Sequence, residues 1–550
     1  MRYVWWLVLV SSSFAQFSDE TTNAGLTFSH TFGETHAGKE MQGGGTVGDF
    51  NRDGWPDLFA LGGSGRPDAL FINQGDGTFV DQSLSFGVQM SHVGVGAAVG
   101  DFNNDGWPDL FITSYGATGS TVGPGHHKLL KNLAGTGFVD ITSTAGVTTS
   151  SSIQHDGFSA AFGDYDLDGD LDLFVTGWFD GALGNCLYRN NGDETFTDVT
   201  DLVSIDRGNT RGFSAHFGDM NGDGYPELLV TADFNSSHYY ANLGNGTFED
   251  RTMLSGCCYE TNGMGGYLGD FNNDGLLDWH ITSIFKSSGL DNDGNMLMLN
   301  LGSHNLFLVP ESSGMRYGFW SWGTIGNDVN HDGWLDIIST NGWATTPYDN
   351  KPTTLYINNG DDTFTESHVA YNINHTGQGR GIAHLDADRD GDMEVVIFSR
   401  NEPLMYLRNN LQGPGTNWIQ IQVETLQPGP FAPFGFGCQV TAHTPNGPQV
   451  HEINGNANYL GNSEPRAHFG LGAATGPIQV DVRWPDLTAN TYYLVPNSHY
   501  RIMAPHVLTS LGTGYSQWPS EFNACFETNP SITQLVSFVN YGACPPRPGF

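Results

Sequence analysis

A nine-residue acidic motif occurs seven times in this chain of 550 residues. Each copy carries an oxygen-bearing side chain at positions 1, 3, 5 and 9 and glycine at position 6, as in Asp49-Phe-Asn-Arg-Asp-Gly-Trp-Pro-Asp57. The first residues of successive copies are separated by 52, 63, 55, 51, 58 and 58 positions. A motif that returns at this period indicates a repeat architecture in which every unit contributes one ion loop.

The residue types in the motif match the requirements of calcium. Ca²⁺ takes about six to eight oxygen ligands at roughly 2.3–2.6 Å, and glycine at position 6 permits the tight turn that brings these oxygens together. Position 7 contributes only its backbone carbonyl, which explains why its side chain varies. The absence of Cys and His from the fixed positions disfavours zinc and copper, and a loop with many protein oxygens disfavours Mg²⁺. We therefore predict up to seven bound Ca²⁺ ions. The predicted ligands are Asp49, Asn51, Asp53, Trp55, Asp57, Asp101, Asn103, Asp105, Trp107, Asp109, Asp164, Asp166, Asp168, Asp170, Asp172, Asp219, Asn221, Asp223, Tyr225, Glu227, Asp270, Asn272, Asp274, Leu276, Asp278, Asp328, Asn330, Asp332, Trp334, Asp336, Asp386, Asp388, Asp390, Asp392 and Glu394.

Two other interpretations of the motif are weaker. An EF-hand begins in the same way but needs a bidentate Glu at position 12 and a helix on each side. Position 12 of the first copy is Ala60, and the flanking residues are typical of strands, so the motif predicts a strand–loop–strand hairpin. Runs of Asp, Asn and Gly can also be ordinary solvated turns, but seven copies in phase disfavour that reading.

The charge of the chain excludes one class of partner. The formal net charge is −38, and 23 of the carboxylates stand at positions 1, 3, 5 and 9 of the motif. Lys and Arg total only 21, so nucleic acid is not an expected partner. Without calcium the clustered carboxylates should repel one another and loosen the fold, whereas an ion that binds only the native state stabilises it.

Residues 1–15 have the features of a secretory signal peptide. Arg2 precedes the apolar run from Tyr3 to Val10, and Ser13-Phe14-Ala15 resembles a cleavage site. The apolar run is too short to span a bilayer, and no later segment is long and apolar enough to do so. The sequence predicts a secreted, extracellular protein without a membrane span, acting as a monomer.

The six cysteines suit an oxidising compartment and match no metal or redox motif. Cys525 and Cys544 bracket a short tail and are expected to pair. Cys257 and Cys258 are adjacent, and at least one of them could reach Cys186 in the preceding repeat. Cys438 is expected to be a buried thiol. Three tripeptides beginning at Asn235, Asn245 and Asn374 are glycosylation acceptors if the host is eukaryotic.

The surroundings of each motif also recur. A strand of small residues such as Gly94–Gly100 leads in, an apolar strand such as Asp109–Thr113 follows the loop, and two further strands are joined by a Gly-containing hairpin turn. Four antiparallel strands repeated seven times predict a seven-bladed β-propeller over residues 16–412. The last repeat lacks an outer strand, and the segment that begins at Phe17 is expected to supply it and close the ring.

These repeats resemble the FG-GAP/VCBS repeats of integrin-α-type propellers. Residues 415–508 resemble the ASPIC/UnbV domain, on the motifs Gly455-Asn-Ala-Asn-Tyr459, Ser463-Glu-Pro465 and His468-Phe-Gly-Leu-Gly472. This order of domains is that of the cartilage acidic protein 1 family and its bacterial relatives. Vertebrate members carry an EGF-like module at the carboxyl end, but residues 511–550 hold only two cysteines, so partners of that module cannot be carried over.

The alternation of apolar and polar residues predicts a small, sandwich-like β domain in residues 415–508, with strands at 418–423, 439–442 and 478–482. Phe469 and Trp484 are expected in its core. Arg466 and His468 could contact a ligand, but a structural role is favoured because lone polar residues at strand ends are common.

Two functions fit the sequence. The first is a secreted calcium-binding propeller that acts in extracellular adhesion or matrix interaction and recognises an unidentified protein or glycan. Its contact loops would join the second and third strands of the blades, at 115–127, 178–185, 285–294 and 343–350, although ordinary surface loops are an equal alternative. The second is a lectin or a carbohydrate-active enzyme, but the chain has no catalytic motif and no enzyme activity is expected.

Overall fold

The computed structural model describes residues 16–31, 39–63, 65–90, 92–114, 127–147, 157–178, 185–286, 293–425, 429–504 and 507–512. The predicted signal peptide and the tail with Cys525 and Cys544 lie outside these ranges. Nearly all described elements are strands, which confirms the predicted all-β class. The short helical segments are α1 (Ser83–Phe86), α2 (Thr142–Ala145), α3 (Thr252–Ser255), η1 (Lys39–Met41), η2 (Glu311–Ser313) and η3 (Pro433–Gly435).

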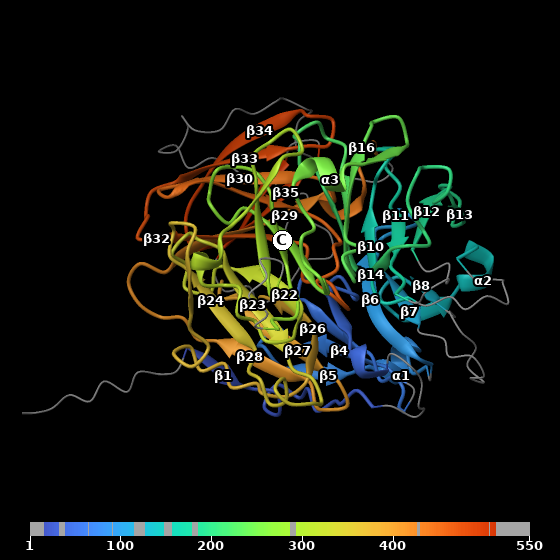
Figure 1. Ribbon diagram of the computed structural model, residues 1–550, viewed down its shortest axis with the longest axis horizontal. Helices are drawn as coiled ribbons and strands as arrows, with labels where there is room; N and C mark the ends of the chain where they lie inside the picture. The colour runs from blue at the N-terminus through green and yellow to red at the C-terminus, as the bar shows by residue number, and fades with distance from the viewer. Residues whose placement is uncertain are drawn as a thin grey trace, which may run out of the picture.

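Seven four-stranded antiparallel sheets, here called blades 1 to 7, make up the described part of the chain before residue 410 (Figure 1). Within blades 1 to 6 the strands pair in chain order. They are β2 (Gly45–Gly48), β3 (Asp57–Ala60), β4 (Ala69–Asn73) and β5 (Phe79–Asp81) in blade 1; β6 (Gly94–Gly100), β7 (Asp109–Ser114), β8 (Lys128–Asn132) and β9 (Phe138–Asp140) in blade 2; β10 (Ala160–Gly163), β11 (Asp172–Val175), β12 (Cys186–Asn190) and β13 (Phe196–Asp198) in blade 3; β14 (Arg211–Gly218), β15 (Glu227–Asp233), β16 (His238–Asn242) and β17 (Phe248–Asp250) in blade 4; β18 (Gly266–Gly269), β19 (Asp278–Ile281), β20 (Met296–Asn300) and β21 (Leu306–Leu308) in blade 5; β22 (Ser321–Asn327), β23 (Asp336–Asn341), β24 (Thr354–Asn358) and β25 (Phe364–Glu366) in blade 6; and β26 (Gly379–Leu385), β27 (Glu394–Ser399) and β28 (Met405–Asn409) in blade 7.

Blade 7 takes its outer strand from the amino end of the described chain. Strand β1 (Phe17–Asp19) pairs antiparallel with β28, with Phe17 opposite Asn409 and Asp19 opposite Leu407. The first strands of the blades contact one another in the cycle β2, β6, β10, β14, β18, β22, β26 and back to β2. The expected closure by the amino-terminal strand is therefore confirmed, and the sheets form a closed ring.

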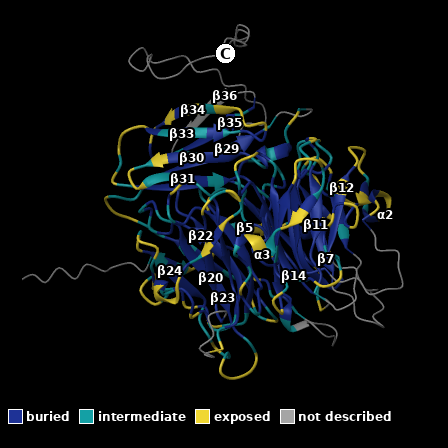
Figure 2. Cartoon of the chain, turned by 45° about the horizontal axis from the view of Figure 1, so that its top comes forward, coloured by how far each residue is buried: buried dark blue, intermediate teal, exposed yellow. Residues whose placement is uncertain are grey.

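The blades stack through apolar residues on both faces of their second strands. In β11, for example, Leu173, Phe174 and Val175 are fully buried, although adjacent side chains point to opposite faces of the sheet. A sheet covered on both faces requires near-continuous apolar strands, which is the pattern of the Asp-Leu-Phe segments that follow the motif. Figure 2 shows the result, with buried strands inside the ring and exposed residues concentrated in the turns.

An asparagine at the end of each third strand joins neighbouring blades. Asn73 Nδ2 in blade 1 donates a hydrogen bond of 2.8 Å to the carbonyl oxygen of Ala387, which is position 2 of the motif in blade 7. The same bond is made around the ring by Asn132 to Phe50, Asn190 to Phe102, Asn242 to Tyr165, Asn300 to Met220, Asn358 to Phe271 and Asn409 to Val329. The ring is thus also closed by side-chain to backbone hydrogen bonds.

Two further four-stranded sheets follow the ring and share one hydrophobic core, as in a sandwich. One sheet pairs in the order β32 (Ala467–Gly472), β29 (Asn417–Glu424), β35 (Ser498–Met503), β36 (Val507–Gly512), and the other in the order β31 (Gly447–Glu452), β30 (Gln439–Thr444), β33 (Ile478–Arg483), β34 (Ala489–Leu494). The three predicted strands correspond to β29, β30 and β33. Phe469 and Trp484 are buried in this core, as expected. Strand β36 extends the sheet to Gly512, past the predicted boundary at 508.

The connection between β31 and β32 enters the axis of the ring. The backbone of this segment, residues 455–463 (here called the plug), bonds to the inner strands of several blades: Ala97 N donates to Leu460 O at 3.3 Å, Thr324 N to Asn458 O at 3.0 Å, and Ala457 N to Ala215 O at 3.2 Å. A Cβ on Gly461 would lie 1.7 Å from Gly45 O, so no larger residue fits there. The small residues of the inner strands make room for this segment.

One expectation about cysteines is wrong. Cys186, Cys257, Cys258 and Cys438 form no disulfide in the described part of the chain, so neither member of the adjacent pair is bonded to Cys186. Cys186 lies in β12 within the core that includes blade 3, whereas Cys257 packs in the core of blades 4 and 5. Cys438 is a buried thiol, as expected.

Candidate metal centres

Each acidic motif forms the loop between the first and second strands of a blade. In blade 1, Asp49 at position 1 accepts hydrogen bonds from the backbone N–H groups of Asp53 (3.0 Å) and Gly54 (2.9 Å), so its carboxylate organises the turn. The glycines at position 6 all have φ between 87° and 98°. This left-handed backbone is the reason that glycine is required there.

Position 4 is also left-handed, which the sequence analysis missed. Six loops place a non-glycine residue there with φ between 53° and 57°, and blade 4 has Gly222 with φ 82°. Asn and Asp tolerate this conformation better than most residues, but the seven loops use varied side chains. Because the side chain at position 4 differs among the copies, the sequence pattern did not indicate its left-handed conformation. These residues are Arg52, Asn104, Leu167, Asn273, His331 and Arg389.

The carboxylate at position 9 is fully buried in every blade, and in five blades it accepts hydrogen bonds from both the loop and the third strand. Asp57 Oδ2 accepts from Phe50 N at 2.9 Å and Asp57 Oδ1 accepts from Asn73 N at 2.9 Å, which links the loop to the third strand. Asp109, Asp172, Asp278 and Asp336 accept the corresponding pair of bonds. Glu227 and Glu394 accept the first of them from Met220 N and Ala387 N. Position 9 therefore has a structural role besides the predicted ion contact.

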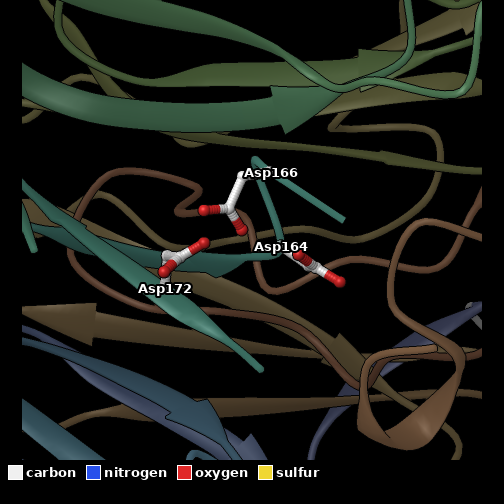
Figure 3. Close-up of side chains that lie close together, drawn as sticks. All are labelled: Asp164, Asp166 and Asp172. Atoms are coloured by element: carbon white, nitrogen blue, oxygen red, sulfur yellow. The ribbon is translucent and has the colours of Figure 1, made fainter. Parts of the chain in front are cut away.

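Two loops bring three carboxylates together. In blade 3, Asp164, Asp166 and Asp172 each place an oxygen within 4.8 Å of the others, and in blade 7 Asp386, Asp388 and Glu394 do the same. Figure 3 shows Asp166 and Asp172 facing one another with Asp164 beside them. These are the two copies with Asp at position 3. In the other five copies Asn stands there, and its amide nitrogen donates to the Asp at position 5 over 2.8–3.0 Å.

The remaining predicted ligands lie in the same loops. The position 5 carboxylates accept a hydrogen bond from the backbone N–H of position 7, as between Trp55 N and Asp53 Oδ1 at 3.0 Å. All six other loops repeat this bond, at Trp107, Asp170, Tyr225, Leu276, Trp334 and Asp392. The structure thus places each predicted ligand set in one turn of the chain.

Burial and mutual repulsion disfavour the ionised carboxylates. Burial, followed by the charge of Asp168, raises the pKa of Asp164 to about 8. Burial is also the main cause that raises the pKa of Asp49, Asp101 and Asp270 to about 7. The position 9 carboxylates have pKa values raised well above the ordinary value, again mainly by burial. A bound cation would remove this penalty by supplying the opposite charge.

The residues present fit a hard divalent cation. Asp166 Oδ1, Asp386 Oδ1, Asp388 Oδ1 and Glu394 Oε1 are buried and have no hydrogen-bond partner. A buried charged oxygen without a partner is costly unless an ion coordinates it. The donor set consists only of carboxylate, amide and carbonyl oxygens, which calcium prefers.

The pH dependence of the ion-free protein follows from these shifts. When the pKa of an acid is higher in the folded state than in the unfolded state, the folded state binds the proton more tightly, and protonation stabilises the fold. This stabilisation is complete below the unfolded pKa of about 4 and is lost as the pH rises through the folded pKa. For Asp49, Asp101 and Asp164 that loss extends to about pH 7–8. In a chelator, we expect the melting temperature to rise between about pH 8 and pH 6. With saturating calcium this rise should disappear, because protons then compete with the ion. A chelated protein that melts at lower temperature on acidification over this range would contradict the assignment.

The carboxyl-terminal domain covers several of these loops. Gln420 Nε2 donates to Asp386 Oδ2 at 2.7 Å, Arg483 Nη2 donates to Asp219 Oδ2 at 2.6 Å, and Val450 N donates to Asp270 Oδ2 at 3.1 Å. Position 1 of blades 7, 4 and 5 is therefore contacted directly by the second domain. Nothing in the repeat pattern indicated this contact, because it joins residues that are distant in sequence.

The two residues considered as ligand contacts in the second domain have structural roles. Arg466 pairs with Glu464 at 2.9 Å, and Glu464 also pairs with Arg389 of blade 7 at 2.7 Å. These two guanidinium groups outweigh the effect of burial and lower the pKa of Glu464 to about 2. His468 is buried, with its Nε2 3.1 Å from Gly391 O. The favoured structural role is thus consistent with their positions between the domains.

Of the four loops suggested for partner contacts, residues 343–350 are described in full. Residues 115–126, 179–184 and 287–292 of the other three lie outside the described part of the chain. His127 is buried. The three glycosylation acceptors Asn235, Asn245 and Asn374 are exposed.

Comparison with known proteins identifies two kinds of domain in the chain. The FG-GAP-like repeat model matches residues 49–112, 164–230, 219–281 and 328–397, and the ASPIC and UnbV model matches residues 431–506. Cartilage acidic protein 1 of Homo sapiens is 28% identical over 312 residues, covering 53% of this chain and 45% of the human protein. Its Mus musculus counterpart is 25% identical over 342 residues, covering 59% of this chain and 51% of the mouse protein.

Among solved structures, rhamnogalacturonan lyase YesW is 12% identical, covers 66% of this chain and 71% of its own, and has a TM-score of 0.34. At this score the similarity carries no functional argument. The chain spans about half the length of the human and mouse relatives. It carries FG-GAP-like repeats followed by an ASPIC and UnbV domain, and it is similar to cartilage acidic protein 1.

Proposed function

We propose that this protein is an extracellular calcium-binding propeller that acts in adhesion or matrix interactions, with the ions stabilising the blades. The relationship to cartilage acidic protein 1 and the FG-GAP repeats support a matrix-type propeller. Among the described residues, no helix has the length and apolar character needed to cross a bilayer.

The observation that carries the calcium assignment is the set of unpartnered carboxylate oxygens in blades 3 and 7. Side chains at positions 1, 3, 5 and 9 and the carbonyl of position 7 would hold the ion in each loop. Bound calcium would supply positive charge that lets neighbouring carboxylates stay ionised side by side. Because each loop joins the first two strands and position 9 reaches the third, an ion there would tie three strands of a blade together.

Calcium titration tests this proposal directly. We expect calorimetry to give several bound ions per chain, up to seven, and chelation to lower the melting temperature. Asp166→Ala should remove about one equivalent of calcium, because it deletes one of the three clustered carboxylates of blade 3. Asp193→Ala, in an exposed hairpin turn of the same blade, should leave the stoichiometry unchanged. Equal melting temperatures with and without chelator would count against the assignment.

We further propose that the protein binds rather than catalyses. The clustered carboxylates suit ligation better than acid–base chemistry, because a bound ion keeps them ionised. A lectin-like or enzymatic role is distinguished by incubating the calcium-loaded protein with polysaccharides. Stable retention without a change in polymer length is expected, and depolymerisation would favour an enzyme.

A further inference from the structure

The end of the ring opposite the ion loops carries a continuous run of aromatic rings. Trp178 stacks on Phe213 (centroids 6.1 Å apart), Phe213 contacts Trp322 (6.4 Å), and Trp322 stacks with Trp320 (6.1 Å) and Trp343 (5.7 Å). Tyr348 packs edge-on against Trp320 at 5.2 Å. These six residues are called the aromatic face. Phe213 and Trp322 are buried, whereas Trp178, Trp320, Trp343 and Tyr348 are partly exposed.

The chain order fixes the position of this face. Each ion loop lies at the start of a second strand, so residues that follow a second strand or precede a first strand lie at the other end of the blade. Trp178 follows β11 and Trp343 follows β23, while Trp320 precedes β22. The two sheets of the carboxyl-terminal domain contact the ion loops at the other end of the ring, and the plug reaches the aromatic face from inside, where Tyr459 packs against the buried Phe213 and Trp322.

Cations gather around this face without carboxylate partners. The guanidinium of Arg380 lies 4.2 Å from the ring centre of Trp322, but it is fully buried and donates to the carbonyl oxygens of Glu40, Gly342 and Gly379, so it supports the rings and does not meet a ligand. Lys351 Nζ lies 5.0 Å from the ring centre of Phe319; Lys351 is partly exposed and Lys286 is exposed. Within the described residues, no carboxylate lies within ion-pair distance of Arg380, Lys351, Lys286 or Arg316. By contrast, Lys128 of blade 2 is paired with Asp140 at 2.7 Å.

Hydrogen-bonding groups show the same contrast between the two ends of the ring. Near the aromatic face the buried atoms without a partner include the donors Arg316 Nη2, Trp320 Nε1 and Asn295 Nδ2. At the ion loops the corresponding atoms are mostly carboxylate and amide oxygens, such as Asp388 Oδ1. Glu260 is an exception, with both oxygens unpartnered, but burial raises its pKa to about 7. One end of the ring therefore suits cations and the other suits an anionic acceptor.

Two carboxylates near the aromatic face are engaged by donors of the protein. Asp233 accepts from Trp178 Nε1 at 3.0 Å and from Asn262 Nδ2 at 2.7 Å, and Asp293 accepts from Lys286 N at 2.5 Å. Among the described residues, neither Asp233 nor Asp293 lies within ion-pair distance of the exposed Lys286 or the partly exposed Lys351. A ligand would have to bring its own negative charge together with flat apolar surfaces for the rings.

We infer that the aromatic face binds an anionic polysaccharide, with sugar rings packed on the indoles and carboxylate or sulfate groups paired with the surrounding cations. This inference rests on the proposed extracellular binding function and gives it a ligand class. A pyranose chain supplies both features at once, because each sugar has an apolar C–H face and can carry an anionic group. An acidic peptide supplies the charge but no rigid flat surface.

The test uses the full chain in millimolar calcium and four immobilised polymers: heparin, hyaluronate, neutral dextran and poly-glutamate. We expect retention on heparin or hyaluronate, which separates sulfate from carboxylate recognition, and weaker binding to dextran and poly-glutamate. The double variant Lys286→Glu/Lys351→Glu should weaken binding about tenfold. The matched reversal Lys128→Glu/Lys131→Glu, which alters two ion-paired cations of β8, should change it less than about twofold.

Three outcomes would overturn the inference: no retention on either anionic glycan, equal binding to poly-glutamate, or equal weakening by both double variants. The melting temperature of each sample with and without chelator is recorded in parallel. A calcium-dependent melt without glycan binding would refute the ligand class while leaving the proposed calcium propeller intact. A melting temperature that is the same with and without chelator would instead refute the proposed function.

Discussion

Deletion of residues 16–30 is expected to lower the free energy of unfolding by more than about 5 kcal/mol, which is the whole stability of many domains. The deletion removes β1, the outer strand of blade 7, together with Leu26 and Phe28. Phe17 and Leu26 are fully buried and Phe28 is 4% exposed. Loss of each such side chain costs about 2–5 kcal/mol, and β28 would also become an unpaired edge.

Single substitutions keep this prediction measurable if the truncated chain does not fold. Leu26→Ala should cost about 2–5 kcal/mol, because the side chain packs against blades 1 and 7. Thr27→Ala, at the exposed position next to it, should cost less than about 0.5 kcal/mol. Urea denaturation in saturating calcium gives both values. Equal midpoints for Leu26→Ala and Thr27→Ala would show that the segment does not close the ring.

The strand order of the ring was predictable because its signals are local and repeated. A glycine at position 6, an apolar second strand and a hairpin turn recur in each copy, so an error in one copy is corrected by the others. The closing strand was predictable for the same reason, since blade 7 lacked an element that the other blades have. The grouping of the predicted ligands followed from spacing alone, because positions 1, 3, 5 and 9 of the motif share one tight turn.

Contacts between distant segments were not predictable in this way. Asn73 was visible as a recurrent strand-end residue, but its bond to Ala387 depends on how blades 1 and 7 are placed. The bond from Gln420 to Asp386 depends in turn on how the second domain docks. Position 9 was assigned to the ion alone, although its oxygens accept backbone N–H groups from two segments. Each of these needs a three-dimensional arrangement that no periodic pattern encodes.

The plug has one signal in the sequence, the small residues of the inner strands, but these fit an empty channel equally well. The structure shows that residues 455–463 fill the axis and bond to inner strands of blades 1, 2, 4 and 6. The ring and the second domain should therefore unfold together in one transition. Two separate transitions in calorimetry would contradict this coupling.

Tyr459→Ala is expected to destabilise both domains by about 3–5 kcal/mol, because a fully buried aromatic ring is removed from the axis of the ring. The Tyr459 ring lies 5.4 Å from that of Trp322 and 5.6 Å from that of Phe213, and its hydroxyl donates to Met41 O at 2.9 Å. Its φ of 140° is rare for a residue with a side chain, so the surrounding contacts must hold it in place. Tyr459→Phe keeps the ring and loses only the hydroxyl bond, so it should cost about 1 kcal/mol. Urea denaturation followed by tryptophan fluorescence measures both variants. If Tyr459→Ala and Tyr459→Phe had the same midpoint, the ring contacts at the axis would contribute nothing and the plug would not join the two domains.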